Sequence, residues 1–406
     1  MAFQHGLSGL NASSRNLDVI GHNIANASTV GMKTSRAEFG ELYASSINAS
    51  GGINSGIGVT LATVSQQFTQ GNITVTGNDM DVAINGSGFF ELTMPDGSMA
   101  YSRAGMFKLD NAGNIVTNSG ASLMGYPTDG DGVRTAFQSQ PLALPTGGPI
   151  PAKQSTAITA EFNLDARAPV AAAAVPVTPF GTYSTSLNAF DAQGLEVPVT
   201  FVFEKAANNQ WNIHTGVNGA APDPAVVWGN VSFLADGSLD VANSNIPQLQ
   251  LASPNDPAVV FNVDVDLADI TQFGTDFAVS NLSQDGYRPG ELTSIGIGDD
   301  GVITARYSNG QSQAAGQIAL VNFRNVQGLS PAGEGNWVQT AASGQPIAGA
   351  PGEGKFGALQ SGALEDSNVD LTGELVNMMT AQRAYQANAQ TIKTQDQVLS
   401  TLTQLR

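Results

Sequence analysis

The stretch AQRAYQANAQTIKTQDQVL, residues 381–399, decides how the rest of the chain is interpreted. It predicts a helix throughout, because it contains no glycine or proline and is rich in good helix formers. Only Arg383, Lys393 and Asp396 are charged, which is less charge than a solvated helix normally carries. We therefore expect this helix to lie against a partner that the neighbouring sequence does not supply.

The uninterrupted helical segment is longer than the quoted stretch. The last glycine is Gly373 and the last proline is Pro351, so residues 374–406 contain no helix breaker. At about 1.5 Å per residue, this segment predicts a rod on the order of 50 Å long. The sequence SNVD, residues 367–370, has the form of a capping box and predicts the start of the helix.

Apolar residues recur in this helix at alternating steps of four and three, and the N-terminal segment repeats the pattern. The C-terminal series is Leu371, Leu375, Met378, Tyr385, Ala389, Ile392 and Leu399, and the N-terminal series is Phe3, Leu7, Leu10, Leu17, Ile20 and Ile24. A seven-residue apolar period is typical of a coiled-coil seam. We predict that the two terminal helices pair as a coiled coil along these residues. The alternative is two amphipathic helices packed separately on a globular core.

The middle of the chain alternates apolar and polar residues between turn motifs, which predicts β-hairpins. The turn motifs are Pro95-Asp96-Gly97, Asp110-Asn111-Ala112-Gly113, Asp299-Asp300-Gly301 and Asn309-Gly310. Asn-Gly is the strongest short hairpin signal among them. We predict a mixed, mainly β fold, with nested discontinuous β-domains in the middle and one α-helix at each end.

Changes in composition along the chain suggest four parts. All 19 prolines lie between Pro95 and Pro351, and joints rich in proline and glycine occur near 141–151 and 346–354. The predicted parts are an inner helical coiled-coil domain, 1–30 with 366–406; a connecting segment, 31–70 with 352–365; an inner β-domain, 71–145 with 285–351; and an outer β-domain, 146–284.

Charge and composition argue against several classes of partner. The formal net charge is −18, and residues 191–300 hold 15 acidic and 2 basic side chains. We therefore expect no binding to nucleic acid or to anionic membrane surfaces. No stretch approaches the roughly 18 apolar residues of a membrane span, so we expect no membrane insertion. The chain has no cysteine, and its start does not look like a cleaved secretory signal.

Motifs that would bind a cofactor or a metal are incomplete. The segment GEGKFG, residues 352–357, follows no predicted strand, and Phe356 stands where a phosphate-binding loop needs Ser or Thr. Asp129 with Asp131, and Asp264 with Asp266, lack the distant Glu of a calcium loop. Strand alternation places the second pair on a solvent-exposed face. We expect no cofactor and no metal site.

Catalytic residues are not recognisable either. The histidines His5, His22 and His214 form no ligand cluster at motif spacing, and no Ser/His/Asp arrangement is legible. We therefore expect a protein that is not an enzyme. A hydrolase with two carboxylates that converge only in the fold is an alternative that the sequence leaves open.

Both ends of the chain resemble the bacterial flagellar rod and hook axial protein family. The segment LSGLNASSRNLDVIGHNIANASTVGMKTSRAEF, residues 7–39, is similar to the N-terminal signature of that family. The C-terminal signature is matched by SNVDLTGELVNMMTAQRAYQANAQTIKTQDQVLSTL, residues 367–402, and the shared β-domain by residues 81–120. Residues 190–215 and 281–301 look like hook rather than rod proteins. The large insertion also favours hook proteins, since rod proteins of this family are much shorter.

The resemblance implies a subunit of the flagellar hook, a curved flexible tube that acts as a universal joint. It implies export through the flagellar type III apparatus and an extracellular location on the flagellum, attached to the basal body. The implied partners are further copies of the chain, the distal rod protein, the hook cap protein and the hook–filament junction protein. A distal rod protein, and a secreted β-rich adhesin that trimerises through its helices, are the alternatives.

A tube that bends while it rotates needs flexible joints, because packed β-domains resist deformation. We predict joints near 145 and 284 and at glycines, where the backbone has most freedom. The glycines are Gly51, Gly52, Gly56, Gly58, Gly352, Gly354 and Gly357. The predicted helix seam should anchor subunits during this motion.

Overall fold

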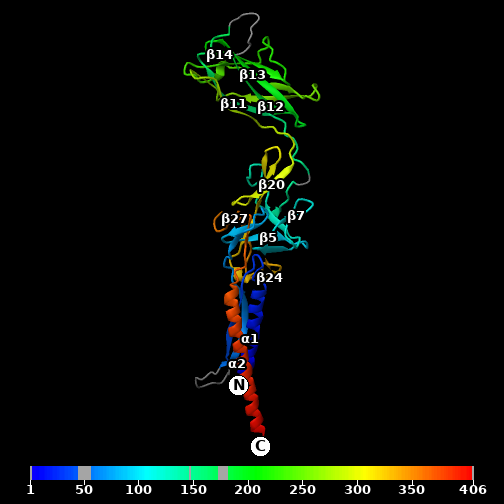
Figure 1. Ribbon diagram of the computed structural model, residues 1–406, viewed down its shortest axis with the longest axis vertical. Coiled ribbons are helices and arrows are strands. Elements are labelled where there is room, and N and C mark those ends of the chain that lie inside the picture. The colour runs from blue at the N-terminus through cyan, green and yellow to red at the C-terminus, as the bar shows by residue number, and fades with distance from the viewer. Residues whose placement is uncertain (1, 44–55, 146–147, 172–181, 405–406) are drawn as a thin grey trace. The chain divides into compact units, whose positions relative to one another are not determined.

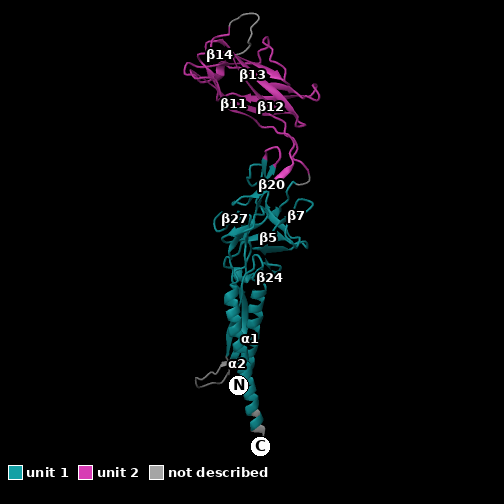
Figure 2. Ribbon diagram, in the orientation of Figure 1, with its two compact units in different colours: residues 1–147, 294–306, 312–406 teal, residues 148–293, 307–311 magenta. Residues whose placement is uncertain are grey.

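The computed structural model describes residues 2–43, 56–145, 148–171 and 182–404. The chain forms two compact units, drawn in different colours in Figure 2. The first comprises residues 1–147, 294–306 and 312–406, and the second comprises residues 148–293 and 307–311. The predicted division into four parts stays a prediction; the second unit includes residues 285–293 and 307–311, which that prediction assigned to the inner β-domain. The class is mainly β with two terminal helices, as the sequence predicted.

Two long helices lie side by side within the first unit (Figure 1). Helix α1 spans Ala2–Ala25 and helix α2 spans Leu371–Gln404. The Asp370 Oδ1 atom accepts the backbone N–H of Thr372 at 3.0 Å, so Asp370 caps α2. The predicted start at Ser367 was too early, because Ser367 Oγ instead accepts the N–H of Val369 in the preceding turn. Within the described residues, neither helix is long and apolar enough to cross a membrane.

A long β-hairpin follows α1 and packs along it. Strands β1 (Ser35–Tyr43) and β2 (Gly56–Gln66) pair antiparallel, and the Val59 N–H donates to Ser8 Oγ at 3.4 Å. A Cβ atom at Gly58 would lie 2.2 Å from Ser8 Oγ, so only glycine allows this approach. The predicted connecting segment is therefore partly a sheet that covers one face of α1.

The largest sheet has 13 strands and lies mainly in the first unit. Its main path is β20 (Leu292–Ile297), β21 (Val302–Tyr307), β22 (Ser312–Ile318), β9 (Ser122–Tyr126), β5 (Phe89–Thr93), β6 (Met99–Ser102), β25 (Asn336–Val338) and β24 (Ser330–Gly333). Strands β7 (Lys108–Leu109), β8 (Ile115–Val116), β10 (Gln140–Pro141), β23 (Leu320–Asn322) and β26 (Ile347–Gly349) attach to this path. The four predicted turn motifs each join neighbouring antiparallel strands of this sheet.

Two short strand pairs and a short helix complete the first unit. Strand β3 (Ile73–Val75) pairs with β28 (Ala363–Glu365), and β4 (Val82–Asn85) pairs with β27 (Ala358–Ser361). The 3-10 helix η2 spans Val326–Gly328. Both strand pairs join a segment that follows α1 to one that precedes α2, so the two ends of the chain meet again at the base of the sheet.

The largest sheet buries apolar side chains on both faces. Phe90 and Leu92 belong to one buried cluster, whereas Phe89 belongs to another with Tyr101 and Trp337. Neighbouring residues of β5 reach opposite clusters because side chains alternate along a strand.

The second unit is a pair of sheets around one core. The first sheet holds β16 (Leu249–Ala252), β17 (Val260–Asp266), β11 (Ala157–Asp165), β18 (Thr271–Phe273) and β19 (Ala278–Gln284). The second sheet holds β12 (Tyr183–Phe190), β13 (Glu196–Ala207), β14 (Gln210–Val217) and β15 (Gly229–Ser232), and the 3-10 helix η1 spans Val241–Asn243. Phe162 from one sheet and Phe203 and Trp211 from the other share the core. Asp264 and Asp266 lie on the exposed face of β17, as the alternation predicted.

Strand β5 also carries a buried carboxylate. Glu91 is only 6% exposed, and its Oε2 atom has no hydrogen-bond partner within the described part of the chain. Burial raises the pKa of Glu91, although a hydrogen bond from Ser139 opposes the shift. The folded chain therefore binds the proton more tightly than the unfolded chain. Stability should fall as the pH rises from the ordinary pKa to the raised one.

We expect Glu91→Gln to remove this fall, so that the variant has a higher free energy of unfolding than the parent near neutral pH. Urea unfolding below about pH 4 and near about pH 8 measures the effect. Glu41→Gln, at an exposed position in β1, should leave the pH dependence unchanged. If the free energy of unfolding of Glu91→Gln depends on pH in the same way as that of the parent, Glu91 is not the group responsible for the fall.

Candidate assembly site

Helices α1 and α2 run antiparallel and meet through polar side chains. Near one end of the contact, Asn23 Nδ2 donates to Glu374 Oε2 at 3.3 Å. Further along, Asn388 Nδ2 donates to Ser13 Oγ at 3.4 Å. Since the residue numbers rise on one helix and fall on the other, the helices point in opposite directions. Amide, carboxylate and hydroxyl groups are unusual in a seam between two helices.

Two glycines of α1 let α2 approach closely. A Cβ atom at Gly6 would lie 3.0 Å from Ile392 Cγ1, and one at Gly9 would lie 2.9 Å from Asn388 Nδ2. By contrast, a Cβ atom at Gly21 would meet nothing within 4 Å. The side of α1 that faces α2 therefore contains Gly6 and Gly9, and Gly21 faces open space in the single chain.

The predicted seam residues lie around this contact with unequal exposure. The exposed ones are Leu7, Leu371, Leu375 and Tyr385; the half-buried ones are Leu10, Leu17, Ile24, Met378, Ala389 and Ile392; Ile20 is buried. The side chains of Phe3 and Leu399 lie outside the described residues. The contact side of α1 and the predicted apolar stripe both repeat at steps of three and four residues. The two stripes are offset by one residue, which turns one about 100° from the other around the helix axis. Periodicity alone cannot tell two such stripes apart.

The glycine contacts make a testable prediction for the monomer. Gly9→Leu and Gly21→Leu both raise intrinsic helix propensity by about 1 kcal/mol. Only the first places a side chain where Asn388 already lies. We expect Gly21→Leu to increase the helix content measured by far-UV circular dichroism and Gly9→Leu to decrease it. An equal increase in both variants would show that the helices do not pair through Gly9 in solution.

A buried ionic network joins the base of the sheet to both helical segments. Lys33 follows α1, Arg103 follows β6, and Glu365 ends β28. Lys33 Nζ donates to Glu365 Oε1 at 2.5 Å, and Arg103 Nη1 donates to Glu365 Oε2 at 3.1 Å. Lys33 and Glu365 are fully buried and Arg103 is 5% exposed. Burial lowers the pKa of both cations, although Glu365 opposes the shift in each case.

Backbone groups complete the network. Lys33 Nζ also donates to the Thr69 carbonyl at 2.8 Å, and Arg103 Nη2 donates to the Gly86 carbonyl at 2.9 Å. The Gly71 N–H donates to Glu365 Oε1 at 2.8 Å. One carboxylate thus faces two cations, each of which also donates to one carbonyl, and these bonds reduce the cost of burying charge. Arg103 Nε has no hydrogen-bond partner among the described residues.

Two asparagines next to this network fasten the hairpin to the helices. Asn368 Oδ1 accepts from the Thr34 N–H and hydroxyl, both at 2.7 Å, and its Nδ2 donates to the Gln67 carbonyl at 2.7 Å. Asn23 Oδ1 accepts the Ser35 N–H at 2.9 Å, and its Nδ2 donates to the Ser35 carbonyl at 2.8 Å. Asn23 therefore fixes the start of β1, and Asn368 fixes the residue that follows the end of β2.

These five side chains are called the polar junction: Asn23, Lys33, Arg103, Glu365 and Asn368. Sequence reasoning did not select any of them. The available signal was the presence of isolated charged and amide residues in terminal segments that otherwise carry little charge. Their convergence could not be inferred, because Lys33 and Glu365 are 332 residues apart.

The predicted joint glycines fall in different environments. Gly51 and Gly52 lie outside the described residues, and Gly56 and Gly58 lie in strand β2. The remaining three lie between β26 and β27. Gly352 and Gly354 have φ angles of +75° and +61° in a turn, and a Cβ atom at either would meet nothing within 4 Å. A Cβ atom at Gly357 would lie 2.5 Å from the Asn85 carbonyl oxygen, so this glycine serves close packing.

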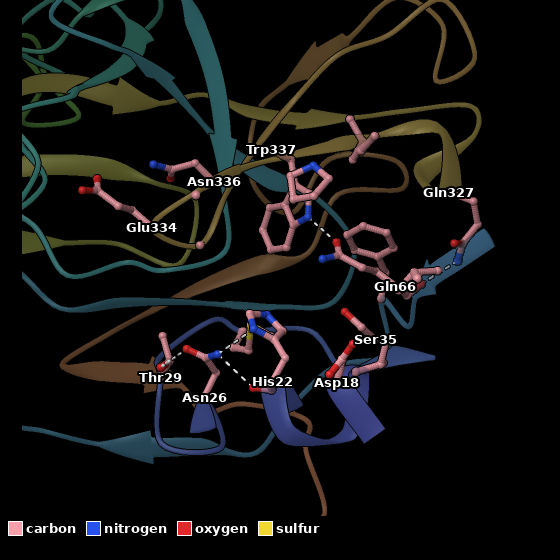
Figure 3. Close-up of a pocket in the computed structure, with 18 residues that line it drawn as sticks. Asp18, His22, Asn26, Thr29, Ser35, Gln66, Gln327, Glu334, Asn336 and Trp337 are labelled. Carbon is pink, nitrogen blue, oxygen red and sulfur yellow. Dashed lines mark hydrogen bonds between the residues drawn. The ribbon is translucent and has the colours of Figure 1, made fainter. Parts of the chain in front are cut away.

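A pocket of about 640 Å³ lies between the end of α1, strand β2 and the β24–β25 hairpin (Figure 3). Its apolar lining includes Val19, Met32, Val64, Phe68, Leu329 and Trp337. The Trp337 ring N–H donates to Gln66 Oε1, which fixes one wall, and the carboxylates of Asp18 and Glu334 also line the pocket.

Comparison with protein-family models matches four segments of the chain to flagellar axial proteins. Residues 3–33 match the model "Flagella basal body rod protein", and residues 83–164 match "Flagellar hook protein FlgE/F/G D1 domain". Residues 163–287 match "Flagellar basal body protein FlaE D2 domain", and residues 360–405 match "Flagellar basal body rod FlgEFG protein C-terminal". The matched segments include both helices and both β units, which defines the class as a structural protein of the flagellar rod and hook.

Curated relatives narrow the class. The chain is 40% identical over 422 residues to the flagellar hook protein FlgE of Escherichia coli, with 100% of both chains covered. It is 33% identical to the FlgE protein of Treponema pallidum, covering 99% of this chain and 98% of the relative. The chain belongs to the flagellar hook protein FlgE family. A crystal structure of Helicobacter pylori FlgE2 has a similar fold, with a TM-score of 0.55 over 72% of this chain and 100% of that chain, at 15% identity.

Proposed function

We propose that this hook protein assembles into a curved, flexible tube that transmits motor torque from the rod to the filament. Each copy is exported through the flagellar type III apparatus and joins the tube outside the cell. The proposed partners are further copies of the chain, the distal rod protein, the hook cap protein and the hook–filament junction protein. Support comes from family membership and from the surfaces of the two helices.

The observation that carries the proposal is an apolar row on α2 that α1 does not cover. Leu371, Leu375, Val376 and Met379 are 47–53% exposed, and Tyr385 is 37% exposed. Little charge surrounds this row, so solvent is a poor partner for it. The contact with α1 uses polar and small residues together with Ile392 instead. A neighbouring copy with the same low-charge helices is the partner that we propose for this surface.

The proposed mechanism separates rigid from movable parts. The polar junction makes the helices, the hairpin and the inner sheet resist bending as one body, because deforming it would expose or separate buried charges. The proposed joint near 145 lies two residues before 147, where the chain first passes between the two compact units. The proposed joint near 284 lies at the end of β19, before the chain returns to the first unit at 294. The contacts of the acidic outer unit with its neighbours are proposed to be hydrated, which permits them to slip during each revolution.

Proteolysis of the monomer beside its polymer tests the proposal, with fragments mapped by mass spectrometry. We expect rapid trimming of the helices of the monomer from both ends, stopping near residues 30 and 370, where the buried polar junction begins, and protection of the same bonds in the polymer. Termini that resist protease in the monomer would mean that the helices are already covered. An assembly role for the apolar row would then lose its support.

A further inference from the structure

One apolar side chain of the first unit projects almost completely into solvent. Phe137 is 91% exposed, more than any other large apolar side chain among the described residues. It lies in the loop of residues 127–139, between β9 and β10, where Thr135, Ala136 and Gln138 are also exposed. Exposing a phenylalanine ring in a loop tip is unfavourable unless another surface covers it.

The base of this loop is fixed, so the tip is held in place before any partner arrives. The Thr135 N–H donates to the Pro127 carbonyl at 2.9 Å. The Arg134 guanidinium pairs with Glu353 at 2.8 Å and lies over the Tyr126 ring at 5.1 Å. These contacts restrict the backbone next to Phe137, so less backbone freedom is lost when the exposed ring binds, which favours its use as an anchor.

The same unit contains a hollow with an aromatic wall. The pocket beside Trp337 is lined by Phe68, Trp337 and aliphatic side chains together with polar ones such as His22, Asn26 and Gln327, and its volume of about 640 Å³ leaves room for an aromatic ring. Its two carboxylates, Asp18 and Glu334, would repel an acidic segment. Residues 134–140, on both sides of Phe137, contain no carboxylate and include Arg134, whereas Asp129 and Asp131 lie further back in the same loop. The segment next to the ring therefore adds no negative charge beside Asp18 and Glu334.

We infer that Phe137 of one copy inserts into the Trp337 pocket of a neighbouring copy. The inference rests on the proposed assembly of identical subunits and names one contact within it. The projecting ring and the pocket are different surfaces of one chain, so the contact is heterologous. A heterologous contact that does not close into a ring propagates as an open helical polymer, which is the geometry that a tube requires.

Disulfide trapping tests the contact directly, because the chain has no cysteine of its own. Two single-cysteine variants, Gln138→Cys and Glu334→Cys, are mixed, polymerised together and oxidised, so that the Phe137 ring beside the first cysteine is kept. We expect a covalent dimer containing one chain of each kind, formed in the polymer and absent from unpolymerised mixtures. Val75→Cys, at a position 77% exposed in the same unit, replaces Gln138→Cys in the control mixture and should give no dimer with Glu334→Cys.

The outcomes separate this contact from the assembly proposal. If the mixed variants polymerise but give no dimer, or no more than the Val75→Cys control, the inserted contact is refuted while assembly stands. If the parent chain itself does not polymerise, the assembly proposal fails. Phe137→Ala supplies a second measurement: the lowest concentration that supports polymerisation should rise about tenfold or more. An unchanged threshold would also overturn the contact.

Discussion

Glu365→Ala is expected to lower the free energy of unfolding of the first unit by about 3–5 kcal/mol. The substitution leaves Lys33 and Arg103 buried at the same point without a counter-charge, and their burial already lowers the pKa of both cations. It also removes the acceptor of the Gly71 N–H. Urea unfolding followed by hydrogen-exchange mass spectrometry measures the effect, since exchange reports the two units separately.

Glu353→Ala provides a matched control for this experiment. Glu353 pairs with Arg134 at 2.8 Å, but its side chain is 64% exposed. An exposed ion pair contributes no more than about 1 kcal/mol, so this variant should unfold close to the parent. Equal losses in the two variants would mean that burial of the Glu365 network does not govern its contribution. The second unit should be unaffected by either change.

Leu375→Glu is expected to abolish polymerisation at concentrations where the parent chain assembles, while the monomer keeps its stability. The side chain is 47% exposed in the single chain, and glutamate is a good helix former near a helix N-terminus. In the proposed tube the same position is covered by a neighbour, where an unpaired carboxylate would be desolvated at a cost of several kcal/mol. Sedimentation measures the polymer, and urea unfolding measures the monomer.

Val259→Glu is the control for added charge. It makes the same change of net charge at a position that is 53% exposed in the second unit. This variant should still sediment as a polymer, because contacts of the outer unit are proposed to be hydrated. If Leu375→Glu polymerises like the parent, the apolar row of α2 is not an assembly surface. If both variants fail to polymerise, the effect belongs to net charge rather than to this row.

Much of the architecture could be predicted from local signals. Absence of glycine and proline marks α2, and turn motifs such as Asn309-Gly310 mark the hairpins, because both effects act within a few residues. Helix ends were less certain. Asp370 rather than Ser367 caps α2, since both residues can bond a nearby backbone N–H and only the folded chain selects one.

The side of α1 that contacts α2 could not be predicted from apolar periodicity. Apolar periodicity predicted that α1 and α2 pair, and the described residues are consistent with pairing. Which stripe faces the partner depends on how closely the backbones approach. Gly6 and Gly9 permit an approach that larger side chains would prevent, so small residues decide the rotation of α1 about its axis. Hydrophobicity alone carries no signal for such positions.

The amino-acid sequence by itself determined the helices, the hairpins, the nested order of the segments and the family. Helix propensity, turn chemistry and signature motifs each depend on residues that are close together in the sequence. Only the tertiary structure decided that Lys33, Arg103 and Glu365 form one buried network and that Trp337 lines a pocket with Met32 and Phe68. The physical reason is that these contacts join residues far apart in the chain. The free energy of these contacts comes from desolvation and packing, and both arise only when folding brings the distant segments together.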